Sequence, residues 1–131
     1  MILLDTHAWV WFISNPEKLS KKAKNSIDKA LKDNEILISS ISAWEVALLV
    51  SKKRLELTID VSDWITSSER LHFIRFIPVD NAIAIRSVYL PEPLHHDPAD
   101  RIIIATSMAY GAPIITMDEK ILNFPHVQSI W

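Results

Sequence analysis

The sequence carries acidic residues at points where strands are expected to end or helices to begin. They are Asp5, Glu45, Asp97, Asp100 and Asp118. Because the carboxyl ends of parallel strands share one edge of a sheet, a parallel sheet would bring these side chains together. Two unit charges about 4 Å apart repel by about 4 kcal/mol at an effective dielectric constant of about 20. We therefore expect a cation among these acids.

The expected cation is a hard metal ion rather than a basic side chain. Arg101 is the only basic residue adjacent to the acids, and Lys120 stands just beyond Asp118. Carboxylate oxygens favour Mg²⁺ or Mn²⁺. Such ions activate water and stabilise phosphoryl oxygens in phosphodiester cleavage, so the residues point to a metal-dependent nuclease.

Each acid taken alone also has a structural interpretation. Glu45 could complete a capping box with Ser42. The other acids could be helix caps or acids of a first helical turn, which stabilise a helix N-terminus: Asp5, Asp97, Asp100 and Asp118. The residues alone leave both interpretations open.

The elements that must position these acids alternate along the chain. Short apolar runs predict strands at 2–4, 36–38, 73–79, 114–116 and 127–130. Helical periodicity and capping patterns predict helices at 8–13, 19–31, 42–53, 61–71, 81–89 and 97–110. Continuous apolar strands between helices favour a three-layer α/β sandwich, a mostly parallel sheet with helices on both faces. We expect one such domain over residues 1–131.

Composition excludes several classes of protein. The 131 residues have a net charge of −2, which argues against nucleic-acid binding through bulk positive charge. The absence of cysteine excludes disulfide scaffolds and thiolate metal sites and fits a cytoplasmic location. The single glycine, Gly111, excludes glycine-rich phosphate loops. We expect neither a membrane span nor a signal peptide.

Four segments that contain the acids resemble the conserved blocks of the PIN domain, most closely those of VapC-type toxins of bacterial toxin–antitoxin pairs. They are ILLDTH (2–7), SAWEV (42–46), HDPADRIIIA (96–105) and ITMD (115–118). They occur in order and cover essentially the whole chain. The resemblance implies a ribonuclease with a parallel sheet flanked by helices. It also implies a dimer that a small antitoxin holds inactive.

The resemblance also assigns roles to individual acids. It implies that Mg²⁺ or Mn²⁺ is bound by Asp5, Glu45, Asp100 and Asp118. Asp97 is then expected to cap the late helix, with Pro98 at its first position, and to contact the site only indirectly. We expect the other residues that support the site to be Thr6, Ser42 and Thr116.

Other features have weaker functional interpretations. The adjacent His95 and His96 lack the helical spacing of a zinc protease motif. The lysine-rich stretch 18–32 could contact RNA, although such faces are more often only solvated. Trp9, Trp11 and Trp44 favour core or dimer packing over base stacking.

The apolar stretch 8–13 and the helix bearing Trp44 carry more apolar surface than one buried face requires. The other apolar residues of that helix are Val46, Leu48, Leu49 and Val50. We expect part of this surface to form a homodimer interface or an antitoxin groove. The alternative function is a non-catalytic RNA-binding or regulatory protein of the same fold, whose signature would be the loss of site acids.

Overall fold

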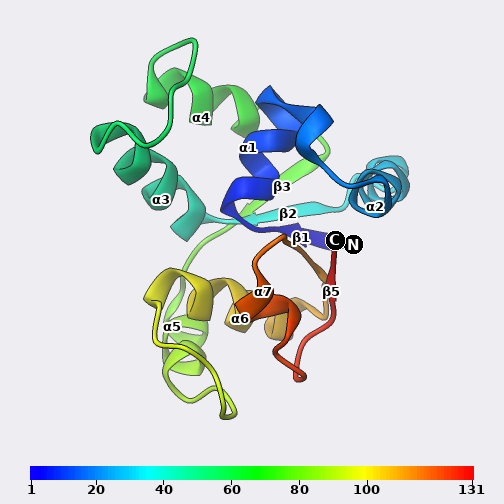
Figure 1. The fold of residues 1–131 in the computed structure, drawn as a ribbon, viewed down its shortest axis with the longest axis vertical. Coiled ribbons are helices and arrows are strands. Elements are labelled where there is room, and N and C mark those ends of the chain that lie inside the picture. The colour runs from blue at the N-terminus through cyan, green and yellow to red at the C-terminus, as the bar shows by residue number, and fades with distance from the viewer.

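A five-stranded sheet forms the middle layer of the computed structural model, which describes residues 1–131 (Figure 1). Its strands are β1 (Ile2–Leu4), β2 (Ile36–Ser39), β3 (Ile74–Ile77), β4 (Ile114–Ile115) and β5 (Ser129–Ile130). Their order is β3-β2-β1-β4-β5, and every neighbouring pair is parallel. The predicted three-layer α/β sandwich is confirmed, with a sheet that is parallel throughout.

Helices cover both faces of the sheet (Figure 1). One face packs against α1 (Thr6–Ser14), α2 (Lys21–Lys32), α3 (Ser40–Ser51) and α4 (Val61–Glu69). The other packs against α5 (Asn81–Val88), α6 (Pro98–Tyr110) and α7 (Glu119–Leu122). A single 3₁₀ turn, η1 (Pro16–Lys18), joins α1 to α2. No helix is both long enough and apolar enough to span a membrane.

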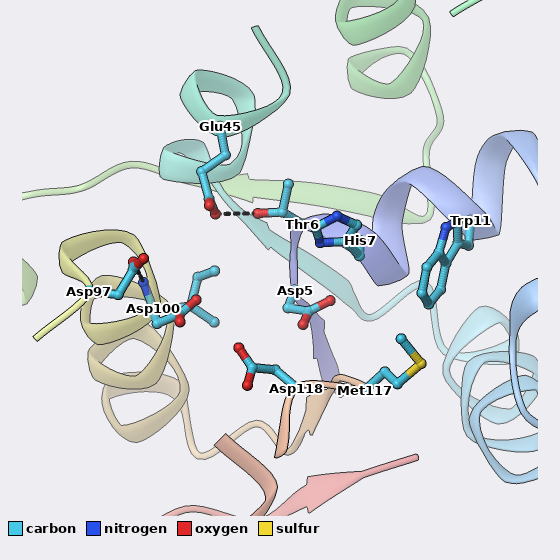
Figure 2. A pocket seen from close by; sticks show the side chains of 10 residues that line it. Asp5, Thr6, His7, Trp11, Glu45, Asp97, Asp100, Met117 and Asp118 are labelled. Atoms are coloured by element: carbon cyan, nitrogen blue, oxygen red, sulfur yellow. Dashed lines mark hydrogen bonds between the residues drawn. The ribbon is translucent and has the colours of Figure 1, made fainter. Parts of the chain in front are cut away.

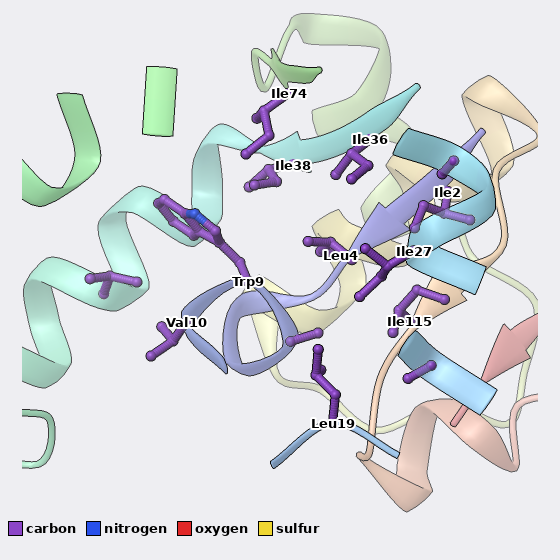
Figure 3. Packing of buried hydrophobic residues seen from close by; sticks show 14 of the residues in the cluster. Ile2, Leu4, Trp9, Val10, Leu19, Ile27, Ile36, Ile38, Ile74 and Ile115 are labelled. Atoms are coloured by element: carbon purple, nitrogen blue, oxygen red, sulfur yellow. The ribbon is translucent and has the colours of Figure 1, made fainter. Parts of the chain in front are cut away.

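β1 and β4 consist of apolar residues, and β2 is apolar up to its last residue, Ser39, because both faces of these central strands are buried. The edge strands also contain polar residues, Arg75 in β3 and Ser129 in β5. Ile2 and Leu4 point into the first cluster of core residues, around Trp9 (Figure 3). Leu3, between them, belongs to the second cluster. This alternation follows from the two-residue period of a strand. The core therefore fixes the register of β1, and with it the position of Asp5 at the end of that strand.

Three helices begin at residues other than those predicted from the sequence, and the predicted ends of several helices differ by one or two residues. α1 begins at Thr6 because Asp5 caps it, and α2 begins at Lys21 because Ser20 caps it. α3 begins at Ser40, and its N-cap is Ser39 rather than Ser42. The structure therefore does not contain the capping box of Ser42 and Glu45, one of the two interpretations that the sequence left open for Glu45, and both side chains are available for other contacts.

The late helix begins and ends as its sequence predicts. The Asp97 side chain accepts a hydrogen bond from the Asp100 amide, with Pro98 at the first helical position. Gly111 ends α6 with φ of 64°, in the left-handed region that favours glycine. The short helix α7 was not predicted, and Asp118 is its N-cap.

Candidate active site

All five acids singled out in the sequence line one cavity of about 420 Å³ beyond the ends of β1 and β4 (Figure 2). Asp5 follows β1 and Asp118 lies just after β4, which pairs with β1. Glu45 reaches the cavity from α3, and Asp97 and Asp100 reach it from the start of α6. The remaining lining residues are Thr6, His7, Trp11, Ile103 and Met117.

Asp5 is held on both carboxylate oxygens. Its Oδ1 accepts a hydrogen bond from the Ala8 amide at 2.8 Å, which caps α1. Its Oδ2 accepts from the Thr116 hydroxyl, which itself accepts from the Asp118 amide at 3.0 Å. Thr116 thus ties Asp5 to the backbone of Asp118.

Glu45 is positioned by a chain of hydroxyl groups (Figure 2). The Thr6 hydroxyl lies 2.6 Å from Glu45 Oε1 and 2.9 Å from the Ser42 hydroxyl. Because a carboxylate only accepts, Thr6 donates to Glu45 and accepts from Ser42. Neither Thr6 nor Ser42 is the N-cap of its helix, since Asp5 and Ser39 take those positions.

Asp100 is held by His95, a residue for which the sequence indicated no role in the site. His95 Nε2 lies 2.7 Å from Asp100 Oδ2. Arg101 donates to the carbonyls of His95, Ser87 and Val88, so it fixes the loop that carries this histidine. His96 is exposed and lies outside the cavity. No local pattern in the sequence links His95 to Asp100, because the contact depends on the path of that loop.

Asp97 and Asp118 each use one oxygen as a helix cap. Asp97 Oδ1 accepts from the Asp100 amide at 3.0 Å, and Asp118 Oδ1 accepts from the Lys120 amide at 2.9 Å. The second oxygen of each carboxylate takes no part in the cap. Capping and lining the cavity are therefore compatible in one side chain.

No lysine or arginine lines the cavity to balance this charge. Burial raises the pKa of Asp5 to about 6, even though the bonds from Thr116 and Ala8 lower it. Burial also raises the pKa of Glu45, and the charges of Asp100 and Asp97 add to the effect. The pKa of Asp100 is raised by burial, then by Asp97 and Asp118. The ionised carboxylates are therefore unfavourable in this site, and a bound cation would stabilise them.

The donors fit a hydrated divalent ion. They are carboxylate oxygens, the ligands that Mg²⁺ and Mn²⁺ prefer. No three acidic or histidine side chains form a closed set of ligands around one point. Mg²⁺ does not require such a set, because it usually keeps several waters and takes one or two carboxylates. A cavity of about 420 Å³ has room for an ion with its water.

Comparison with known proteins identifies the family. The PIN domain profile matches residues 2–127, which is nearly the whole chain. This chain belongs to the PIN domain family. Its sequence is also 30% identical to Ribonuclease VapC22 of Mycobacterium tuberculosis over 129 residues, 98% of this chain and 95% of the relative.

Solved structures share the fold of this PIN domain. VapBC2 from Rickettsia felis, bound to a DNA fragment from its promoter, matches with a TM-score of 0.70 at 21% identity, over 98% of this chain and 97% of the other. A toxin–antitoxin complex from Klebsiella pneumoniae matches with a TM-score of 0.61 at 21% identity, over 95% and 93%. The predicted PIN-like fold is confirmed.

We expect the metal-free PIN domain to become more stable as the pH falls from about 7.5 to about 5. A carboxyl group whose pKa is higher in the folded chain binds more protons there, so the free energy of unfolding rises as pH falls through that pKa. For Asp5, whose pKa rises from 3.8 to about 6, the gain is about 1 kcal/mol over this range. Urea unfolding in EDTA at the two pH values measures it.

The matched variant is Asp5→Asn, whose amide oxygen can still accept from the Ala8 amide. In this variant, the free energy of unfolding should no longer change with pH through Asp5, although the contributions of Glu45 and Asp100 to that change should remain. At neutral pH the variant should be at least as stable as the parent. A variant destabilised by several kcal/mol at neutral pH would show instead that Asp5 serves mainly to hold the fold.

Proposed function

We propose that this PIN domain is an endoribonuclease that cleaves RNA phosphodiester bonds with Mg²⁺ or Mn²⁺. The observation that carries the proposal is a cavity lined by five carboxylates and by no lysine or arginine. The ions would be held by Asp5, Glu45, Asp100 and Asp118. The identity to a protein named a ribonuclease supports the same activity.

The chain's own groups would set the geometry of this reaction. Thr116 and the Ala8 amide hold Asp5, Thr6 holds Glu45, and His95 holds Asp100. Each side chain is fixed before substrate arrives, which reduces the reorganisation needed during reaction. A bound divalent ion supplies positive charge for the phosphate oxygens and makes water a better nucleophile.

The alternative, a non-catalytic RNA-binding or regulatory protein of this fold, is less well supported. Such a protein would be expected to have lost site acids, whereas every predicted acid lines the cavity here. The contacts that hold Asp5, Glu45 and Asp100 would also have no evident purpose in a site without catalytic activity.

We further propose that the chain is the toxin of a pair restrained by a small antitoxin, since proteins of similar fold were solved in toxin–antitoxin complexes. The apolar surface expected to bind a partner is partly core, because Trp9, Val10 and Val46 are buried. Trp44 on α3 remains 56% exposed. The homodimer stays a prediction, and α3 is the surface we assign to it or to the antitoxin.

Incubation of the purified chain with cellular RNA tests the activity. We expect discrete cleavage products in Mg²⁺ or Mn²⁺, none in excess EDTA, and recovery when the ion is restored, because the carboxylates alone repel a phosphodiester. Cleavage at full rate in EDTA would contradict the metal-dependent mechanism. Asp80→Asn is a suitable control, because Asp80 caps α5 outside the cavity.

A further inference from the structure

The side of the cavity farthest from Asp97 and Asp100 is apolar and aromatic rather than acidic (Figure 2). His7, Trp11 and Met117 form it, and we call these residues the apolar shelf. His7 and Trp11 lie one turn apart on α1, with ring centroids 5.8 Å apart. Met117 reaches the same side from the segment between β4 and α7.

The apolar shelf is accessible from the cavity. Met117 is 52% exposed, His7 is exposed and Trp11 is half-buried. Ile103, the remaining apolar residue of the lining, is only 1% exposed and offers no comparable surface. Aromatic and apolar side chains that gather at one side of a polar cavity are typical of a ligand-binding surface.

The Trp11 ring is held in place from outside the cavity. Its centroid lies 5.7 Å from that of Trp131, and the Lys18 ammonium lies 5.9 Å from it. A fixed indole loses little freedom when a second flat ring packs on it. The exposed Lys18 adds a positive charge beside the ring, in a region whose cavity has no lysine or arginine of its own.

Resting on the proposed ribonuclease function, we propose that the apolar shelf is a nucleobase subsite. The base next to the cleaved phosphodiester packs against Trp11, His7 and Met117, and Lys18 binds a neighbouring phosphate. A base and its phosphate are joined through a single ribose, so a phosphate at the carboxylates brings a base to an adjacent wall. The apolar shelf is the wall with the matching chemistry.

This subsite favours RNA in which the bound nucleotide is unpaired. Every base has an apolar face, so stacking on an aromatic side chain tolerates different sequences. A base packed on the shelf has left its neighbours in the strand, and unpaired RNA permits this most readily. The expected substrate therefore presents an unpaired nucleotide beside the cleaved bond.

Fluorescence anisotropy with a labelled single-stranded RNA of random sequence tests the subsite. The protein carries Asp100→Asn in Mg²⁺, so that the RNA stays intact. We expect Trp11→Leu to weaken binding by about 5-fold to 100-fold, the range found for loss of one stacked base, and Trp11→Phe to weaken it less. Tyr89→Leu is the control, since Tyr89 is an aromatic residue that is 81% exposed and does not line the cavity.

Trp11 also packs against the core, so a second variant separates binding from folding. His7→Ala removes an exposed part of the shelf, should leave the melting temperature unchanged, and should weaken RNA binding by about 5-fold or more. Binding unchanged in both His7→Ala and a folded Trp11→Leu would overturn the subsite while leaving the ribonuclease function intact. If the parent does not cleave RNA and Asp100→Asn does not bind it, the proposed ribonuclease function is contradicted, and the subsite with it.

Discussion

Asp100→Asn is expected to lower the rate of RNA cleavage by about 100-fold or more, while the metal-free protein stays at least as stable as the parent. Loss of a residue that only supports a metal ligand typically costs 10-fold to 100-fold, so loss of a ligand should cost at least as much. Stability should not fall, because burial and the neighbouring Asp97 and Asp118 raise the pKa of Asp100. The variant removes that unfavourable charge and can still accept a bond from His95.

The neighbouring Asp97 provides the control for this prediction. Its Oδ1 caps α6, so Asp97→Ala should lower the free energy of unfolding by about 1 kcal/mol. Asp97→Asn should restore the cap, and both variants should keep most of the activity. Cleavage assays and melting curves on all three variants make the comparison. If Asp97→Asn loses activity as completely as Asp100→Asn, Asp97 also binds the metal and our division of roles is wrong.

The convergence of the acids could be predicted because it follows from topology. Buried apolar strands connected by helices favour a parallel sheet, in which the carboxyl ends of the strands meet at one edge. Asp5 and Asp118 follow the adjacent strands β1 and β4 for this reason. Only a parallel sheet and two strand ends were needed for that prediction.

Which group holds which acid could not be predicted in the same way. Thr6 lies 39 residues from Glu45 in the sequence, and His95 reaches Asp100 through a proline-rich loop. The predicted start of the helix at Ser42 is wrong, because a local pattern matched a capping box there, whereas Ser39 caps the helix one turn earlier. Local patterns give the residue types at helix starts, but tertiary packing decides which residue begins the helix.

The structural and the catalytic interpretation of an acid do not exclude each other. A carboxylate has two oxygens, and Asp97 and Asp118 each use only one as a cap. The cap fixes the side chain and leaves the other oxygen outside that bond. Helix N-termini at the end of a parallel sheet are therefore suitable places to hold acids that must stay close together.

Because the site acids carry unfavourable negative charge, binding of a metal ion to them should also raise the free energy of unfolding. An ion that binds only the folded chain raises the free energy of unfolding by about 2.7 kcal/mol at 100 times its dissociation constant. For a domain of this size that corresponds to a rise of roughly 10 °C in melting temperature. Removal of a ligand should reduce the rise and leave the metal-free baseline unchanged or higher.

A titration of melting temperature against Mn²⁺, starting from EDTA-treated protein, tests the central claim most directly. The parent and Asp80→Asn should show the same saturable rise, because Asp80 caps α5 outside the cavity. Asp5→Asn and Asp100→Asn should start at or above the parent and gain much less. Equal rises in all four proteins, or no rise in the parent, would show that these carboxylates do not form the metal site.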